Sequence, residues 1–320
     1  MNHVWIDTDM GFDDLAAVLT VAHTPGWVVD GLSLVAGNAP IDIVVDNALR
    51  AAAFFDWNFP IHPGCARPLS GPLVTAQNVL GADGMKSAGL SLPLQRAELN
   101  SEDGVSALMG YLERAAQSAT VLALGPLTNL ATVLNTRPAL GSKIGNLIWM
   151  GGSAGPGNHT AAAEFNAAVD PEAVQGVLDS KVAALKMVGL DACRQVRVHA
   201  SDAQVLREMG TARGNVLADL LLGYIRIASS DGSTPMSLYD PTAAAALVSP
   251  EGMVFRAAHV AAELKGQHTR GMTVVEWRVP RRATANALVA SQANEALLRQ
   301  VVLDALHLAA GLTAPDMTIP

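Results

Sequence analysis

The sequence has few cationic side chains. Lysine and arginine number 21 against 29 aspartate and glutamate residues, so the formal net charge is −8. A nucleic-acid-binding protein needs cations to displace phosphate counterions, and a protein held at an anionic membrane surface needs a basic cluster. The shortage of cations argues against both classes, and we expect neither nucleic acid nor a membrane as partner.

Long apolar runs and cysteines are also scarce. No stretch approaches the roughly 18 consecutive apolar residues that suggest a membrane-spanning helix, and the first residues lack the cationic start of a secretory signal. Cys65 and Cys193 are the only two cysteines. They are too few for a disulfide framework, although one disulfide between them stays open. We therefore expect a cytoplasmic protein.

Apolar residues are abundant and follow a regular pattern. They make up 50% of the chain, which provides for a large buried core. Strands are expected at 3–6, 31–36, 119–124 and 144–150, and helices at 15–19, 43–55 and 127–134. This alternation predicts an α/β fold with a mostly parallel central sheet and helices on both faces. In such folds ligands bind beyond the carboxyl ends of the strands.

The C-terminal third is less regular. Residues 253–262 and 272–278 are expected to form a hairpin around a turn at 266–271, and residues 290–312 one long helix or two. The sequence contains no internal repeat and no convincing linker. We therefore predict a single domain over residues 1–320, with an extra C-terminal hairpin and helices.

Four carboxylates lie within eight residues after the first predicted strand, in the segment Asp7-Thr8-Asp9-Met10-Gly11-Phe12-Asp13-Asp14. Like charges this close repel and raise each other's pKa. A helix N-terminus would stabilise Asp13 or Asp14 by ~0.3–1 kcal/mol each, but it gives Asp7 and Asp9 no role. A hard divalent cation would give these two residues a role as well. Ca²⁺ takes about six to eight oxygen ligands, whereas zinc and iron recruit histidine or cysteine. Helix capping and metal binding both stay open on these residues alone.

This segment and four later motifs, in order along the chain, resemble one family. The later motifs are Ala36-Gly37-Asn38, Leu124-Gly125-Pro126-Leu127-Thr128-Asn129, the run from Met150-Gly151-Gly152 through Gly157-Asn158 to Glu164-Phe165-Asn166, and Asp240-Pro241. The set is similar to the calcium-dependent nucleoside hydrolases, the inosine-uridine-preferring nucleoside N-ribohydrolase family. The resemblance implies a Rossmann-type fold, hydrolysis of the N-glycosidic bond of ribonucleosides to ribose and free base, and a homo-oligomer, either a dimer or a tetramer.

The resemblance also implies a metal site. The ligands of Ca²⁺ would be Asp9, Asp14, Asp240 and the backbone carbonyl of Leu124. Asp9 would be the general base that takes a proton from a Ca²⁺-bound water. Asn38 would orient the metal-site carboxylates, with Asp7 behind them. Asp240, followed by Pro241, is also typical of a helix N-cap with proline at the first helical position, and the two roles are compatible.

The same resemblance implies how a ribose is held. Asp13 would accept the 2′-hydroxyl, Asn166 would contact the 3′-hydroxyl, and Asn158 with Glu164 would bind the 5′-hydroxyl, with Met150 also at the substrate. Buried polar partners penalise a ligand that lacks the matching hydroxyl by ~1–3 kcal/mol. Specificity for ribose is therefore expected.

Two positions depart from the family pattern. Many relatives have a histidine directly before the aspartate equivalent to Asp240, where this chain has Tyr239, and a second histidine where it has Leu80. A tyrosine, with a reference pKa of about 10, is a poorer proton donor at neutral pH, although its ring can stack on a base. We expect Tyr239 beside the leaving base, while Tyr224, Arg226 or a base that departs easily are alternatives.

Other interpretations account for part of the pattern. Asp7-Thr8-Asp9 also fits a haloacid-dehalogenase-like phosphatase, which leaves Asp13-Asp14 unexplained. A nucleoside- or ribose-binding protein of the same fold with little turnover would follow from the replaced histidines. His62 and His159 are expected in loops from which they can approach the mouth of the site, and Cys193 is expected to be a buried thiol.

Overall fold

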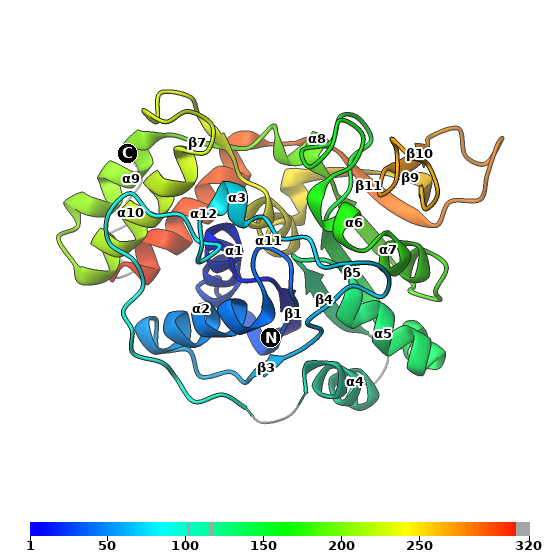
Figure 1. The fold of residues 1–320 in the computed structure, drawn as a ribbon, viewed down its shortest axis with the longest axis horizontal. Helices are drawn as coiled ribbons and strands as arrows, with labels where there is room; N and C mark the ends of the chain where they lie inside the picture. Colours follow the sequence, from blue (N-terminus) through cyan, green and yellow to red (C-terminus); the bar gives the residue numbers. More distant parts are fainter. Residues whose placement is uncertain (101–102, 116–117, 312–320) are drawn as a thin grey trace.

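One mixed sheet forms the centre of the molecule (Figure 1). The computed structural model describes residues 1–100, 103–115 and 118–311. The nine strands of the sheet lie in the order β10-β9-β11-β6-β5-β4-β1-β2-β3. Their bounds are β1 Asn2–Thr8, β2 Trp27–Leu34, β3 Ile61–Pro63, β4 Ala119–Ala123, β5 Ile144–Met150, β6 Leu185–Val188, β9 Met253–Ala262, β10 Thr273–Glu276 and β11 Ala287–Ala293.

Seven of these strands, from β11 to β3, pair in parallel. The other two, β9 and β10, pair antiparallel with each other, and β9 pairs antiparallel with β11. The predicted α/β fold with its mostly parallel sheet and the C-terminal hairpin are therefore confirmed. The strands β7 Arg197–Val198 and β8 Met236–Ser237 form a separate two-stranded sheet.

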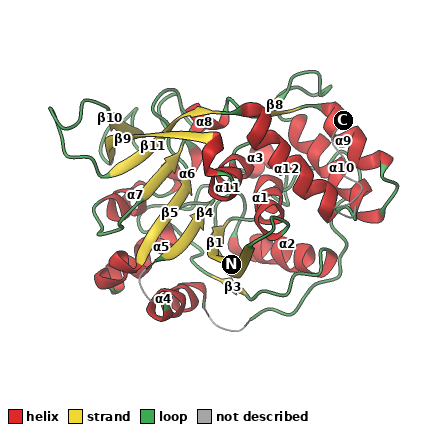
Figure 2. Cartoon of the chain, turned by 180° about the vertical axis from the view of Figure 1, so that it is seen from behind, coloured by secondary structure: helices red, strands yellow, loops and turns green. Residues whose placement is uncertain are grey.

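Helices cover both faces of the main sheet. They are α1 Phe12–Ala22, α2 Ile41–Phe54, α3 Gln77–Leu80, α4 Gly104–Arg114, α5 Thr128–Thr136, α6 Phe165–Val169, α7 Pro171–Leu178, α8 Leu190–Cys193, α9 Ala200–Glu208, α10 Ala212–Ile225, α11 Asp240–Val248 and α12 Glu295–Ala309, with 3₁₀ turns at Pro138–Lys143 and Pro250–Gly252. The helices α9 and α10 lie at the end of the molecule opposite the β9–β10 hairpin, as both overall views show (Figure 2).

Alternation along the strands divides the core between the two faces. Ile6 belongs to the apolar cluster under α1, α2, α10, α11 and α12, whereas its neighbour Trp5 belongs to the cluster under α4, α5 and α7. Successive side chains of a strand point to opposite faces. Strands buried on both sides therefore read as continuous apolar runs, which is why the sequence shows them so clearly.

The topology places a crevice between β1 and β4. From β1 the chain proceeds through β2 to β3 on one side of the sheet, and then returns to β4, β5 and β6 on the other side. Ligands of doubly wound α/β proteins bind where the strand order reverses, outside the carboxyl ends of the strands. The carboxylate-rich residues that follow β1 and the Leu124-Gly125-Pro126 turn that follows β4 lie at this crevice.

The prediction for residues 290–312 is wrong in part. Residues 290–293 are the end of β11, and the helix α12 begins only at Glu295. The strand forms because Leu288 and Val289 pair with β6 while residues 287–293 pair with β9. Residue 312 lies outside the described residues. In the part of the chain that is described, no helix combines the length and apolarity needed to cross a membrane.

Candidate active site

The turn between β1 and α1 has a strained backbone. Met10 has a positive φ of 37°, which is uncommon for a residue other than glycine. Its N–H donates to Thr8 Oγ1 at 3.1 Å, and its carbonyl accepts from Asn47 Nδ2 at 3.2 Å. Strained conformations persist where surrounding contacts fix them, and they cluster at functional sites. The turn leads directly from Asp9 to the first residues of α1.

Asp14 lies at the centre of this turn and is fully buried. Its Oδ1 accepts from Thr8 Oγ1 at 2.6 Å and from the Asp9 N–H at 3.2 Å, and its Oδ2 accepts from the Gly11 N–H at 2.8 Å and Asn38 Nδ2 at 3.0 Å. Gly11 is the N-cap of α1, so the helix-start interpretation holds for Asp14. These donors fix the orientation of its carboxylate.

Three further carboxylates surround Asp14. Ligand oxygens of Asp13, Asp14 and Asp240 lie within 4.8 Å of one another. Asp9 is 2% exposed, and its Oδ2 accepts the Asn38 N–H at 2.7 Å. The distances between ligand atoms thus group Asp13 with Asp14 and Asp240 as possible metal ligands, whereas the resemblance implies Asp9 in place of Asp13. All four carboxylates nevertheless lie at the same end of the cavity. Among the described residues, no lysine or arginine forms a salt bridge with any of the four.

This crowding changes the acidity of the group. Burial raises the pKa of Asp9 and of Asp240 well above the usual range, and the charge of Asp14 raises both further. Burial and then Asp14 raise the pKa of Asp13 to about 7. Three buried carboxylates and the half-buried Asp13, without a cationic partner among the described residues, fit a hard divalent cation, because such an ion takes oxygen ligands and supplies the missing positive charge. The donor set contains no imidazole or thiolate, the ligands that zinc and iron prefer.

Asp7 lies one strand residue before Thr8 and is buried behind this group. Its Oδ1 accepts from Asn129 Nδ2 at 2.8 Å and from the Ser33 hydroxyl, whereas its Oδ2 has no hydrogen-bond partner. Burial raises its pKa to about 7. Asp7 does not line the cavity described below.

Opposite the carboxylates, one amide ties the ends of two strands together. Asn166, in α6, donates from Nδ2 to the Leu124 carbonyl at 2.7 Å and to the Met150 carbonyl at 3.0 Å. Leu124 follows β4 and Met150 ends β5. Since both amide hydrogens are used, Asn166 presents its oxygen to the cavity.

Glu164 and Asn158 form the next part of this wall. Glu164 caps α6: its Oε1 accepts the Asn166 N–H at 2.8 Å, and its Oε2 accepts the Gly152 and Ala167 N–H groups at 2.8 and 3.0 Å. Burial nevertheless raises the pKa of Glu164 to about 6. Asn158 Oδ1 accepts the Phe165 N–H at 2.9 Å, which leaves its Nδ2 as the group available to a ligand.

A cavity of about 450 Å³ lies between these walls. Its lining includes ten of the eleven predicted site residues, namely Asp9, Asp13, Asn38, Leu124, Met150, Asn158, Glu164, Asn166, Tyr239 and Asp240. The eleventh, Asp14, lies behind Asp13 and Asp240 at ligand distance. The structure therefore brings all eleven together, from segments as far apart in the chain as β1 and α11.

The mouth of the cavity is more apolar. It is lined by Thr75, Ala76, Asn78, Val79 and Leu80 at α3 and, opposite, by Tyr224, Ile227, Met236 and Tyr239. Burial raises the pKa of Tyr239 to about 12, so its phenol keeps its proton at neutral pH. The Tyr224 hydroxyl donates to the Ser237 carbonyl at 2.8 Å. Except for Leu80, Tyr224 and Tyr239, the sequence did not predict these mouth residues.

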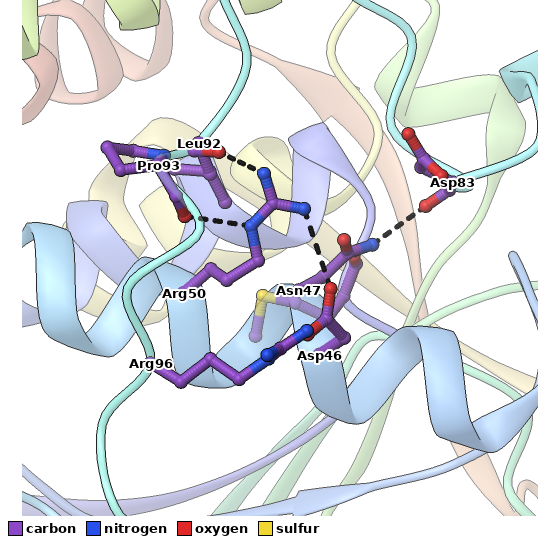
Figure 3. Close-up of polar contacts among 8 residues, drawn as sticks. Asp46, Asn47, Arg50, Asp83, Leu92, Pro93 and Arg96 are labelled. Atoms are coloured by element: carbon purple, nitrogen blue, oxygen red, sulfur yellow. Dashed lines mark hydrogen bonds and ion pairs between the residues drawn. The ribbon is translucent and has the colours of Figure 1, made fainter.

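The α3 segment is held against the site by α2 (Figure 3). Asn47 Nδ2, which holds the Met10 carbonyl, also donates to the Asp83 carbonyl at 2.8 Å. Arg50 donates to the carbonyls of Leu92 and Pro93, the latter at 2.8 Å. One buried amide thus links the strained turn to the segment that carries Leu80. Asn47, the seventh residue of α2, gave no signal of this role in the sequence.

Four further residues that the sequence suggested near the site differ in their position relative to the cavity. His62 is in the strand β3, stacked on Trp5 at 5.8 Å, and does not line the cavity, whereas His159 does. Arg226 follows α10 and is not among the lining residues. Tyr224, the other alternative to Tyr239, is buried and lines the cavity.

Two predictions concern the region around Tyr239. Asp240 is the first residue of α11 rather than its N-cap, which is Tyr239. Cys193 is a buried free thiol, as expected, and Cys65 is free as well, so the two form no disulfide.

The fold and site define a class of protein. It is a doubly wound α/β protein with a carboxylate-lined cavity suited to a cation, located between β1 and β4, where the strand order reverses. The sequence pattern of the family described as "Inosine-uridine preferring nucleoside hydrolase" matches residues 4–300. The chain belongs to this family. The predicted enzyme class, a hydrolase that acts on the N-glycosyl bond of ribonucleosides, is thereby confirmed.

Individual relatives agree with this assignment. The chain is 34% identical over 275 residues to the pyrimidine-specific ribonucleoside hydrolase RihA of Salmonella paratyphi C, covering 85% of this chain and 88% of that protein. It is 34% identical over 277 residues to RihA of Citrobacter koseri, covering 86% and 88%.

Solved structures share the fold. A plant nucleoside hydrolase, PpNRh1, is 27% identical with a TM-score of 0.85, covering 95% of this chain and 98% of that one. The purine-preferring ribonucleoside hydrolase from Gardnerella vaginalis has a TM-score of 0.89 at 22% identity, covering 98% and 100%. At 22% identity, the similarity to the Gardnerella vaginalis enzyme supports the fold alone.

Proposed function

We propose that this protein hydrolyses ribonucleosides to ribose and free base in the cavity between β1 and β4, with Ca²⁺ as its cofactor. The observation that carries the proposal is the convergence of four carboxylates, three buried and Asp13 half-buried, on a cavity whose other wall is lined by amides, with no cationic partner among the described residues. That combination suits an ion and a polyhydroxylated ligand together.

Asp9, Asp14, Asp240 and the Leu124 carbonyl would hold the ion. A carbonyl oxygen has two lone pairs, so the bond that Leu124 accepts from Asn166 leaves one for the metal. When bound, such an ion orients a water and lowers its pKa. Asn38 supports this set by donating from its backbone to Asp9 and from its side chain to Asp14.

Asp9 is the general base in this proposal. The Asn38 N–H fixes Oδ2 of its carboxylate, against which Gly37 packs closely, while Oδ1 lies beside Gly125, where a Cβ would be 3.1 Å away; Asp9 lines the cavity. Asp9 accepts the proton of the attacking water as the C1′–O bond forms and the C1′–N bond breaks; the electron pair of that bond leaves with the base, which takes a proton from solvent. General-base catalysis contributes about 10²- to 10⁴-fold in rate.

The sugar hydroxyls are matched by donors and acceptors that internal bonds leave unused. Asp13 accepts a hydrogen bond from the 2′-hydroxyl, and Asn166 Oδ1 accepts one from the 3′-hydroxyl. Asn158 donates from Nδ2 to the 5′-oxygen, and Glu164 Oε1, which has one lone pair left beside its bond from the Asn166 N–H, accepts a hydrogen bond from the 5′-hydroxyl. Met150 lines the same wall.

Tyr239 contacts the leaving base. Its high pKa makes it a stacking and hydrogen-bonding partner rather than an acid at neutral pH. The base therefore departs with little help from an enzyme acid, which favours bases that leave without protonation at a purine nitrogen. The two RihA relatives are named pyrimidine-specific, and we propose uridine and cytidine as the preferred substrates.

The test is ribose release from uridine, cytidine, inosine and adenosine, measured before and after chelation and again after Ca²⁺ is added back. We expect the pyrimidine nucleosides to be turned over fastest, activity to disappear on chelation and Ca²⁺ to restore it. Full activity after complete chelation would refute the metal role. Tight calorimetric binding without any product would instead support the alternative, a binding protein of the same fold.

Other expectations stay predictions alongside this proposal. They are a single domain over residues 1–320, a cytoplasmic location, a dimer or tetramer, and no nucleic-acid or membrane partner. Size-exclusion chromatography with light scattering measures the oligomeric state directly.

A further inference from the structure

We propose that Asp191 and Arg194, at the two ends of the short helix α8, are positioning residues that hold the loop of residues 153–164 and thereby determine how strongly the site uses the 5′-hydroxyl of its substrate. The inference rests on the proposed function. Neither side chain lines the cavity. Both act through the backbone of the loop that carries Asn158 and Glu164.

Arg194 holds the part of the loop directly before Asn158. Its Nη1 donates to the Pro156 carbonyl at 3.0 Å and its Nη2 to the Gly157 carbonyl at 3.0 Å. A guanidinium is planar, always charged and rigid, so two bonds to successive carbonyls fix both the position and the tilt of that backbone. The next residue along is Asn158.

Asp191 holds the beginning of the same loop. Its Oδ2 accepts the Ala154 N–H at 2.6 Å and lies 3.1 Å from Ser153 Oγ, which in turn accepts the Gly155 N–H at 3.1 Å. A Cβ at Gly155 would lie 2.9 Å from Asp191 Oδ1, so the loop packs closely on this carboxylate.

The rest of the loop is shaped by its own bonds. The Ala163 carbonyl lies 3.3, 3.1 and 3.2 Å from the backbone nitrogens of Asn158, His159 and Thr160, which donate to it. These bonds define the curvature of residues 157–163, but they do not fix that unit relative to the cavity. The loop is fixed by the Asn158 bond to Phe165, by the Thr273 hydroxyl, which bonds to both backbone groups of Ser153, and by Asp191 and Arg194, which together we call the clamp.

The helix α8 also links the start of this loop to the opposite side of the cavity. The Leu190 N–H donates to the carbonyl of Gly152, which directly precedes the loop, at 3.0 Å, and Cys193 Sγ lies 3.6 Å from the Tyr239 carbonyl oxygen. The clamp therefore sets the loop relative to Tyr239 and Asp240, the residues of the base and metal side. Loss of the clamp should move the 5′ end of the site without altering the carboxylates around Asp14.

The experiment compares two substrates in clamp variants of the full chain. The substrates are uridine and 5′-deoxyuridine, or the matching pair for the fastest base of the panel. For Arg194→Ala we expect kcat/KM for the ribonucleoside to fall about 10- to 100-fold, the effect of a displacement of about 1 Å. For the 5′-deoxy analogue it should change less than about threefold, the scatter of uncoupled changes.

Conservative variants and a matched control sharpen the comparison. Arg194→Lys keeps the positive charge but not the planar pair of donors, so its kcat/KM for the ribonucleoside should lie between those of the wild type and Arg194→Ala. Asp191→Asn keeps an acceptor oxygen, so its kcat/KM for the ribonucleoside should fall less than that of Asp191→Ala. Arg197→Ala removes an exposed cation of the same segment whose side chain bonds only to the Arg194 carbonyl among the described residues, and it should behave like wild type.

The outcomes separate the two proposals. Equal losses on both substrates in Arg194→Ala, with an unchanged melting temperature, would overturn the positioning role. A wild-type protein that releases no ribose from any nucleoside would instead overturn the proposed function. If Arg194→Ala fails to fold, the two substrates are compared in Arg194→Lys instead. An equal loss of kcat/KM on both substrates in that variant would also overturn the positioning role.

Discussion

The floor and the mouth of the cavity are built in different ways. The floor consists of Asp9, Asp13, Asp14, Asp240 and the Leu124 carbonyl. The mouth consists of Thr75, Ala76, Asn78, Val79 and Leu80 with Tyr224, Ile227, Met236 and Tyr239. Asp9 is 2% exposed and follows the interior strand β1, while Val79 is 48% exposed on a four-residue helix. The polar floor is thus built on the sheet, whereas one side of the mouth is an exposed segment outside it.

The same contrast appears in the family comparison. Every floor residue matches the resemblance of the sequence to the nucleoside hydrolases, and the two departures, Leu80 and Tyr239, both belong to the mouth. Floor substitutions should therefore abolish turnover for every base. Mouth substitutions should instead change the preference among bases.

The largest effect is expected for Asp9→Asn. The variant keeps the shape of the side chain but removes the base, so kcat should fall about 10²- to 10⁴-fold for all nucleosides, measured as ribose release. Asp42→Asn, at an exposed aspartate in α2, is the matched control and should retain wild-type turnover. Wild-type rates in Asp9→Asn would contradict the assignment.

Chelation should remove activity and also lower the melting temperature in a pH-dependent way. Burial raises the pKa of Asp7 and of Asp13 to about 7, above their usual range. A carboxyl with a raised pKa binds more protons when folded, so the metal-free protein should lose stability as pH rises from about 4 to above 7. The stabilisation by Ca²⁺ should be greater at pH 8 than at pH 5. A gap between the loaded and chelated midpoints that does not grow with pH would oppose this.

A smaller effect is expected for Asn47→Ala, which loosens the link between floor and mouth. The change leaves the carbonyls of Met10 and Asp83 without their donor, so the free energy of unfolding should fall by about 1–3 kcal/mol, measured by denaturant titration. Affinity for Ca²⁺ should weaken too. Arg50→Ala loosens only the outer part of the same segment and should leave the affinity unchanged. Equal loss of affinity in both variants would contradict the link.

The smallest effects on rate are expected at the mouth. Tyr239→Phe keeps the ring and its stacking and removes only the hydroxyl, so kcat/KM for uridine should change by less than about 10-fold, because one neutral hydrogen bond contributes only about 0.5–1.5 kcal/mol. Leu80→His should raise the ratio of inosine to uridine turnover by introducing a proton donor. A Tyr239→Phe rate as low as that of Asp9→Asn would show that the mouth carries chemistry as well.

The floor could be read from the sequence because its residues follow apolar strands directly. Asp9 and Leu124 come immediately after buried runs, and parallel strands end at the same edge. The mouth could not be read in this way. The position of α3 depends on Asn47 and on a bond from the Ala76 N–H to the Asn38 carbonyl at 3.2 Å, contacts between distant segments that leave no local pattern.

Two errors in the sequence-based prediction have a similar physical origin. Residues 290–293 are apolar and short, and such a run is compatible with helix or strand until its partners are known. Here β6 and β9 pair with β11 and decide the matter. His62 was expected in a loop, but the three residues of β3 pair with β2 and extend the sheet by one strand. The His62 ring then packs on Trp5.

The most direct test of the account is a calorimetric titration of the metal-free protein with Ca²⁺, because the division into floor and mouth depends on an ion at the floor. We predict one ion per chain in the wild type and an affinity about 10- to 100-fold weaker in Asp240→Asn, the cost of removing one charged partner. Asp83→Asn, an exposed aspartate beside the mouth, should bind as the wild type does. The account would be contradicted by absence of binding in the wild type, or by equal affinity in Asp240→Asn and Asp83→Asn.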